Sequence, residues 1–596
     1  MTNSRNLILA AALSFMLLFG WDAVVRYLYP QPATPPATAT AQASGQPDVG
    51  SPQPGDSPAS VDTAKIAHSR AGGLMDPKQI ALEKADLKTA LASPDRIPID
   101  APRVAGSINL DTGTIDDLVL KDYRETVDKN SPPVRLFSPQ GTPAQQFAEF
   151  SFLLNGKRLP AGKWQADGTR LTPTTPVTLH RQGPDGIGLS IKLSIDKDYM
   201  IHADQRVDNS GSTNAVVQPF ALINRTDRNA SQDLWIAHSG PIGMFNDAAD
   251  YDVDYKDLGA GQVSSPTGKI GWMGFTDIYW LSALVPQAGA QAKADFRGLG
   301  DNLFRADLVY SPISVPAGRA ASVTTQLFAG AKASDILSHY EKAGIPKFDL
   351  AIDWGWFRWF EQPFLWLLNQ LFHLAGNFGV AIILLTVIVR GALFPIAQKQ
   401  FASMAAMKAI QPRMKAIQEK YKDDKMKQQQ EMQKLFKDEG VNPLAGCLPM
   451  LLQAPILFAL YKVFVLAIEM RHQPFILWIR DLSAPDPATV LNLFGLLPFH
   501  PTGFLAIGVL ALLLGFTMWL TFRLNPAPAD PVQQKMFSIM PWMMMFVMAP
   551  FAAGLLLYWT TSNLLTIAQQ KYLYSRHPQL RAAVEKERKA VKAAAD

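Results

Sequence analysis

The sequence predicts a polytopic α-helical membrane protein with about six transmembrane helices and a separate β-rich domain. Two observations lead to this fold class. Several long apolar runs, of which 377–396 is the clearest, are about as long as a helix that crosses a bilayer. Between 62 and 345, by contrast, short alternating patterns such as Leu189 to Ile195 predict half-buried strands without interleaved helices, which favours an all-β sandwich.

The first apolar run, within residues 1–29, predicts an uncleaved membrane anchor. A cleaved signal peptide needs a small-residue site soon after its apolar core, whereas the bulky Trp21 and Tyr29 follow here. The basic Arg5 places the N-terminus in the cytoplasm. Residues 30–61 are rich in Pro, Ala, Thr and Ser and contain too few apolar groups to offset the entropy of ordering, so we expect a disordered periplasmic linker.

The second half of the chain predicts a helical membrane core. Aromatic residues and a polar side alternate at helical spacing in 350–376, which indicates an amphipathic helix in the outer interface. The polar side consists of Arg358, Glu361, Asn369 and His373. The apolar runs that follow predict spans at about 377–396, 446–468, 503–522, 535–549 and 552–573 within a core of 377–574.

Basic residues set the predicted topology, since their placement matters more than the net charge of +5. They gather in 397–441 and in the tail 575–596, which therefore belong in the cytoplasm. Two apolar stripes separated at Asp423 and Asp424 predict that 397–441 is a helical hairpin. It either contacts lipid or a partner, or simply connects two spans.

The sequence contains no catalytic or metal-binding motif that we can support. The single cysteine, Cys447, excludes an internal disulfide framework and a multi-cysteine metal site. In the β-rich domain, His202 and His238 belong to no motif with a predicted structural context. We therefore assign no catalytic residue, no metal and no cofactor.

Arg390 is the most informative single residue. An arginine inside a transmembrane helix costs roughly 2.5–3.5 kcal/mol even on mild scales, so it is a functional-site hypothesis by default. It either extends to the nearer membrane surface or faces water held inside the protein. Thr386, one helical turn earlier on the same face, favours the second interpretation.

Polar residues on two further spans are candidate neighbours of Arg390. Gln453 lies in one span, and Thr560, Asn563 and Gln570 fall at near-helical spacing in another. Polar groups on three separate spans predict one shared wet cavity.

The 535–549 span is rich in methionine. The residues concerned include Met536, Met540, Met543 and Met544. Methionine makes adaptable apolar binding surfaces, but it also fills gaps in cores. The pattern alone leaves both interpretations open.

Four segments together resemble the YidC family of bacterial membrane-protein insertases (YidC/Oxa/Alb). They are TVIVRG (386–391), NPLAGCLPMLLQAPILFALY (442–461), LNPAPADPVQQKM (524–536) and GLLLYWTTSNLLTIAQQ (554–570). Their order and spacing also fit, and the resemblance extends more loosely through the β-rich domain to the anchor. This combination is far more specific than any one short motif.

The resemblance implies a fold and a site. The family has a five-helix insertase core with a hydrophilic groove, and Gram-negative members add an anchor and a large periplasmic β-supersandwich domain. The groove arginine and threonine map onto Arg390 and Thr386, and the aromatic pair of the last span maps onto Tyr558 and Trp559. Trp559 stands where some relatives carry tyrosine.

The resemblance also implies a function. We expect an insertase and folding chaperone of the bacterial inner membrane, which inserts nascent membrane proteins alone or with the Sec translocon and its accessory subunits. A substrate helix would slide along the methionine-rich span, in contact with membrane lipids. The basic tail and the 397–441 hairpin would contact the ribosome weakly, and DNA is not an expected partner.

Two other functional classes remain. A secondary transporter would use Arg390 as an intramembrane anion site, but the spans show no pair of matching halves. A membrane enzyme acting through the β-rich domain would need paired carboxylates or metal-ligand spacing, and neither occurs in a supporting context.

Overall fold

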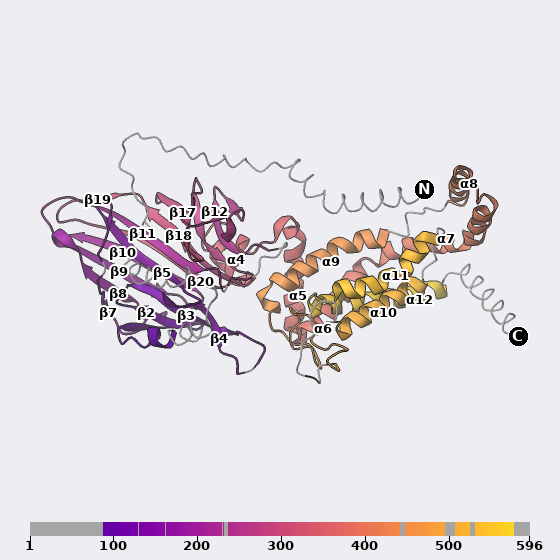
Figure 1. Ribbon diagram of the computed structural model, residues 1–596, viewed down its shortest axis with the longest axis horizontal. Helices are drawn as coiled ribbons and strands as arrows, with labels where there is room; N and C mark the ends of the chain where they lie inside the picture. The colour runs from indigo at the N-terminus through magenta and orange to yellow at the C-terminus, as the bar shows by residue number, and fades with distance from the viewer. Residues whose placement is uncertain are drawn as a thin grey trace. The chain divides into compact units, whose positions relative to one another are not determined.

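The computed structural model describes residues 87–128, 130–160, 162–228, 230–231, 237–440, 448–494, 497, 507–524 and 531–576. Figure 1 draws the strands in indigo to magenta and the later helices in orange to yellow. The predicted anchor, the linker and residues 577–596 of the tail lie outside the described residues, so those predictions stay untested.

The β-rich domain contains a large antiparallel sheet. Its main strands lie in the order β1 (Arg96–Asp100), β2 (Val104–Asn109), β3 (Thr114–Arg124), β5 (Gln146–Leu154), β11 (Ala215–Thr226), β18 (Leu303–Tyr310), β17 (Ala292–Gly300) and β14 (Val263–Ser264). Short strands β4 (Pro133–Phe137), β6 (Lys157–Arg158) and β19 (Ile313–Val315) pair with β3, β5 and β11. Strands distant in sequence are therefore neighbours, as β5 and β11 are.

A second antiparallel sheet completes the domain. Its order is β13 (Ala248–Asp250), β12 (Gly240–Phe245), β15 (Ile270–Thr276), β16 (Trp280–Val285), β20 (Ala320–Ala331), β10 (Met200–Asn209), β9 (Ile187–Ile195), β8 (Val177–Gln182) and β7 (Gln165–Asp167). The alternation in β9 is confirmed, because every second residue from Ile187 to Ile195 is buried. The periplasmic-type β-sandwich predicted from the sequence is thus present.

The described part of 62–345 is not wholly β-structured, because it contains a short helical segment at 87–91 and a longer helix near its end. Helix α4 (Ser334–Lys342) follows the last strand and buries Ile336, Leu337 and Tyr340. These three residues are spaced for one face of a helix, a signal too short to stand out in the sequence.

Eight further helices form the second part. They are α5 (Arg358–Ala375), α6 (Phe378–Ala392), α7 (Phe394–Lys420), α8 (Lys425–Asp438), α9 (Leu448–Leu466), α10 (Val509–Leu524), α11 (Pro531–Met548) and α12 (Ala553–Arg576). Helix α12 packs against α6, α9 and α10, while α5 packs against α6 and α9. The α12 helix therefore connects the elements that carry the candidate site residues.

A helical hairpin is present within 397–441. Asp424 begins α8, because its side chain accepts a hydrogen bond from the backbone N–H of Lys427 at 3.0 Å. Ile410 and Met414 of α7 pack against Leu435 of α8. The two apolar stripes thus face each other across the turn.

The 377–396 run is not one helix, contrary to the prediction. Asn377 caps the start of α6, but this helix ends at Ala392 and α7 begins at Phe394. Pro395 lies at the second position of α7, and proline is tolerated in a first helical turn but not in a helix interior. The run is divided for this reason.

The remaining predicted spans correspond to α9, α10, α11 and α12, with ends shifted by several residues. In the described part of the chain, no helix combines the length and the apolar character needed to cross a membrane.

The interfacial helix differs from its prediction in one side chain. Glu361, expected on the polar side of 350–376, is fully buried near the start of α5. Trp359 and Trp366 are instead exposed, with 67% and 64% of their surface accessible, and Leu374 and the predicted His373 are exposed as well. The sequence pattern could not reveal which neighbour covers Glu361.

Candidate functional site

Arg390 lies in the last turn of α6 and reaches α12. Its Nε donates a hydrogen bond to Oγ of Ser562 at 2.9 Å, and its Nη2 contacts the same oxygen. Among the residues that the structure describes, no carboxylate pairs with this half-buried guanidinium. Arg390 thus has a fixed orientation and an uncompensated positive charge.

Gln453 and Tyr558 extend this contact to a third helix. Nε2 of Gln453 on α9 donates to the hydroxyl of Tyr558 at 2.8 Å. Tyr558 is only 1% exposed, lies one turn before Ser562 on α12, and interacts with both Ser562 and Arg390. We call Arg390, Gln453, Tyr558 and Ser562 the polar cluster.

The sequence analysis missed Ser562. A small hydroxyl residue in an apolar segment has many structural uses, so the type alone carries no signal. Its position four residues after Tyr558 is the one available indication, because residues at this spacing share a helix face.

Two other predicted groove residues bond elsewhere. Oγ1 of Thr386 donates to the backbone oxygen of Ile382 at 2.6 Å, within its own helix, and Thr386 is fully buried. Nδ2 of Asn563 donates to Oγ1 of Thr517 on α10 at 3.2 Å. The structure therefore brings neither side chain into hydrogen bonding with Arg390.

The other predicted residues of α12 are mostly buried. Thr560 and Gln570 are 6% and 2% exposed, and Trp559 is half-buried against the core. The Oγ1 of Thr560 is enclosed without a hydrogen-bond partner among the described residues. These residues therefore lie on α12 but outside the polar cluster.

The methionines of α11 divide between two roles. Met536 and Met543 are more than half exposed, whereas Met540 and Met544 are half-buried. Exposed apolar residues continue this surface: Ile539, Trp542, Phe546 and Val547. The helix thus presents an apolar stripe, while Met545 and Met548 fill the core.

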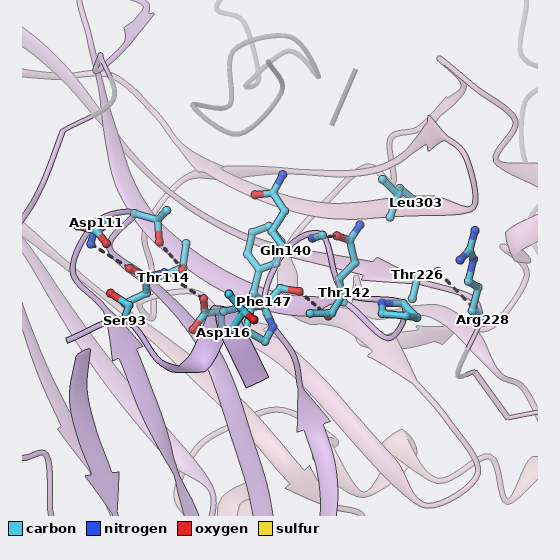
Figure 2. A pocket seen from close by; sticks show the side chains of 18 of the residues that line it. Ser93, Asp111, Thr114, Asp116, Gln140, Thr142, Phe147, Thr226, Arg228 and Leu303 are labelled. Carbon is cyan, nitrogen blue, oxygen red and sulfur yellow. Dashed lines mark hydrogen bonds between the residues drawn. The ribbon is translucent and has the colours of Figure 1, made fainter. Parts of the chain in front are cut away.

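A pocket of about 470 Å³ lies in the β-sandwich, at the ends of β2, β3, β5 and β11. Figure 2 shows its lining, in which Thr114 and Asp116 lie on one side and Thr226 and Arg228 on the other. Threonine, asparagine and glutamine side chains dominate it, and Phe147 supplies an aromatic surface.

The pocket's buried polar atoms largely bond to one another. Thr114 and Thr112 share a hydrogen bond of 2.7 Å between their Oγ1 atoms, and Oγ1 of Thr142 donates to the backbone oxygen of Pro139 at 2.6 Å. Asp116 is paired with Arg96, while burial raises the pKa of the Asp116 carboxyl. These side chains are therefore used in holding the turns that surround the pocket.

Comparison with known proteins covers both parts of the chain. Residues 96–367 match the family described as YidC periplasmic domain, and residues 370–580 match the 60Kd inner membrane protein family. A membrane protein insertase YidC from Zymomonas mobilis is 42% identical over 581 residues, which cover 96% of this chain and 95% of the relative. One from Bradyrhizobium diazoefficiens is 40% identical over 607 residues and covers 97% of each chain.

Solved structures give weaker matches. A crystal structure of an active YidC insertase with its first transmembrane domain resolved has a TM-score of 0.35 and 19% identity, covering 82% of this chain and 98% of that one. A galactose mutarotase-like protein from Lactobacillus casei has a TM-score of 0.28 and 10% identity, covering 39% of this chain and all of its own. The sequence relatives decide the assignment: the chain belongs to the YidC family of membrane protein insertases.

Proposed function

We propose that this insertase brings the polar end of a nascent membrane protein into the bilayer by offering it the polar cluster in place of water. An unsatisfied backbone group in hydrocarbon costs several kcal/mol, so a partial substitute for hydration removes a large barrier. The observation that carries the proposal is Arg390, a half-buried guanidinium held by a serine hydroxyl and paired with no carboxylate among the described residues. Its charge is therefore available to an acidic group of the substrate.

The apolar part of the substrate needs a different surface. The exposed stripe of α11, which includes Met536 and Met543, offers one on a helix that packs against α10, which itself packs against α12. A substrate helix would move along this stripe, and its partition into lipid would then drive release. No covalent bond changes in this mechanism.

Membrane placement follows from the family, whose description names an inner membrane protein. We propose six transmembrane helices, comprising the anchor within 1–29 and the five runs of the core, with both termini in the cytoplasm and the β-sandwich in the periplasm. The exposed Lys415, Lys422 and Lys427 of the α7–α8 hairpin support its cytoplasmic position.

The partners follow the same topology. Nascent membrane proteins are the substrates that an insertase requires. We propose the Sec translocon and its accessory subunits as partners, with the ribosome in weak contact through the basic tail and the hairpin.

The rival functions gain no support. Relatives that match nearly the whole chain are insertases, which are neither transporters nor an enzyme class. The relatives therefore do not favour a transporter with an anion site at Arg390.

Crosslinking of a stalled nascent chain tests the proposed path. We expect photo-crosslinkers at Gln453, in the polar cluster, and at Met543, on the stripe, to capture the substrate. The matched control is Leu513 of α10, which is 43% exposed and belongs to neither surface. Capture at Leu513 equal to that at Gln453, or none at Gln453, would contradict the path.

A further inference from the structure

Two turns between α9 and α10 expose bulky apolar side chains. The first turn (475–479) and the second turn (489–494) are each closed by a backbone hydrogen bond between their end residues, of 3.0 and 2.8 Å. Between 41% and 82% of the surface of each exposed apolar residue is accessible, so the fold itself leaves them largely uncovered. We call these residues the apolar tips: Ile476, Leu477, Val490, Leu491, Leu493, Phe494 and Leu497.

The backbone at three of the apolar tips is unfavourable for the residues it carries. Leu477, Leu493 and Phe494 have φ of +56°, +51° and +61°. This left-handed conformation favours glycine or asparagine and is unfavourable for a bulky side chain. Because apolar residues nevertheless occupy these positions and are exposed there, their side chains point to a contact outside the fold.

A buried aspartate joins the two turns to α10. Oδ1 of Asp486 accepts hydrogen bonds from Nε1 of Trp478 in the first turn at 2.9 Å and from the backbone N–H of Ala488, just before the second turn, at 3.0 Å. Its Oδ2 accepts from the backbone N–H of Leu510, in the first turn of α10, at 2.8 Å. The apolar tips are therefore presented by a built structure.

The second turn satisfies much of its backbone internally. The N–H of Thr489 donates to Oδ1 of Asn492 at 2.9 Å, and the N–H of Asn492 donates to Oγ1 of Thr489 at 3.2 Å. Nδ2 of Asn492 also donates to the oxygen of Pro487 at 2.8 Å. A loop in water can leave such groups to the solvent, whereas a loop that leaves water must pair them. The second turn is thus suited to a medium that is poor in water.

The length of α10 places its outer end inside the bilayer. The helix has 16 residues and is therefore about 24 Å long, whereas the hydrocarbon core is about 30 Å thick. Under the proposed topology, Arg523 in its last turn marks the cytoplasmic surface, so α10 begins roughly 6 Å below the outer surface. The sequence agrees, because no Lys, Arg, Asp or Glu occurs between Asp486 and Arg523.

We propose that the apolar tips lie in the outer leaflet of the bilayer and contact the acyl chains of phospholipids. The segment between α9 and α10 is then a membrane anchor attached to α10 through Asp486, and not a water-exposed loop. A periplasmic protein is the other conceivable occupant, but the depth at which α10 begins favours lipid. The proposal rests on the proposed topology, in which α9 and α10 cross the bilayer, and is independent of the polar cluster.

Fluorescence quenching by lipid tests the proposal in the full-length protein, reconstituted in vesicles of phosphatidylethanolamine and phosphatidylglycerol. Cys447→Ser removes the single native cysteine, and Leu477→Cys, Leu493→Cys or Phe494→Cys then introduces one site for the environment-sensitive fluorophore NBD. The quenchers are a phospholipid with a nitroxide on its acyl chain, and iodide on both sides of the membrane.

The matched control is Val216→Cys. Val216 is also an exposed apolar residue, with 40% of its surface accessible, but it lies on β11 of the β-sandwich. At the three apolar tips, we expect emission shifted to the blue, at least twofold quenching by the nitroxide lipid and little quenching by iodide. Val216→Cys should show the reverse pattern, because its label is in water.

Two outcomes would overturn the proposal. Quenching of the three apolar tips by iodide, as at Val216→Cys, would place them in water, as would happen if the bilayer were locally as thin as α10 is long. A blue-shifted emission that the nitroxide lipid does not quench would show that protein covers them. Three positions are used so that one variant that fails to fold does not decide the result. Since lipid contact is measured and not insertion, a negative result leaves the proposed function standing.

Discussion

Arg390→Ala is expected to reduce insertion of substrates with acidic translocated tails by about tenfold or more, since a hydrogen bond to a charged group contributes roughly 1.5–3 kcal/mol. Arg390→Lys should restore most of this activity, because it keeps the charge that attracts the acidic tail. The lysine loses the two-atom contact with Ser562, so recovery should remain incomplete. Insertion is measured in proteoliposomes without Sec.

Two comparisons isolate the contribution of charge. A substrate with an uncharged tail should be affected little by Arg390→Ala, because the guanidinium then has no anion to bind. Ser562→Ala keeps the charge but removes its hydrogen-bond partner, so it should have a smaller effect than Arg390→Ala. Equal activity of wild type, Arg390→Ala and Arg390→Lys on acidic-tailed substrates would remove the electrostatic argument.

The polar cluster was partly predictable from the sequence. Arg390 and Gln453 stand out because polar groups in apolar runs require a partner or water. Such groups can be recognised from the amino-acid sequence alone. Thr386 looked equally informative, but its hydroxyl bonds to the carbonyl of its own preceding turn. That local alternative is open to any threonine in a helix and cannot be excluded from sequence.

The fold shows the same division between local and long-range signals. The alternation of β9 and the break at Asp424 are local patterns, and both were predicted correctly. Glu361 is buried on α5, which packs against α9, a helix that lies about a hundred residues later in the chain. The sequence periodicity of α5 does not indicate this burial, so it places Glu361 on the polar side of the predicted helix.

Asp277→Ala is expected to destabilise the β-sandwich by about 3–5 kcal/mol, because it leaves Arg225 charged, buried and unpaired. Arg225 is 1% exposed, and its Nη2 donates to both oxygens of Asp277 at 2.8 and 2.7 Å. Burial alone would lower the pKa of Arg225, but the carboxylate of Asp277 overcomes this effect and raises it. Native-state hydrogen exchange of β11 in the full-length protein measures the loss.

The matched control is Asp208→Ala. Asp208 also accepts hydrogen bonds from two nitrogen atoms of one arginine, Arg206, with distances of 2.7–3.1 Å. Both of these side chains are about half exposed, so water replaces the lost partner and exchange should not change measurably. The two pairs differ in burial and in a further hydrogen bond that Asp277 accepts from the backbone N–H of Ser231 at 2.8 Å, so we attribute a different response to the loss of these buried contacts. Similar losses in both variants would contradict that explanation.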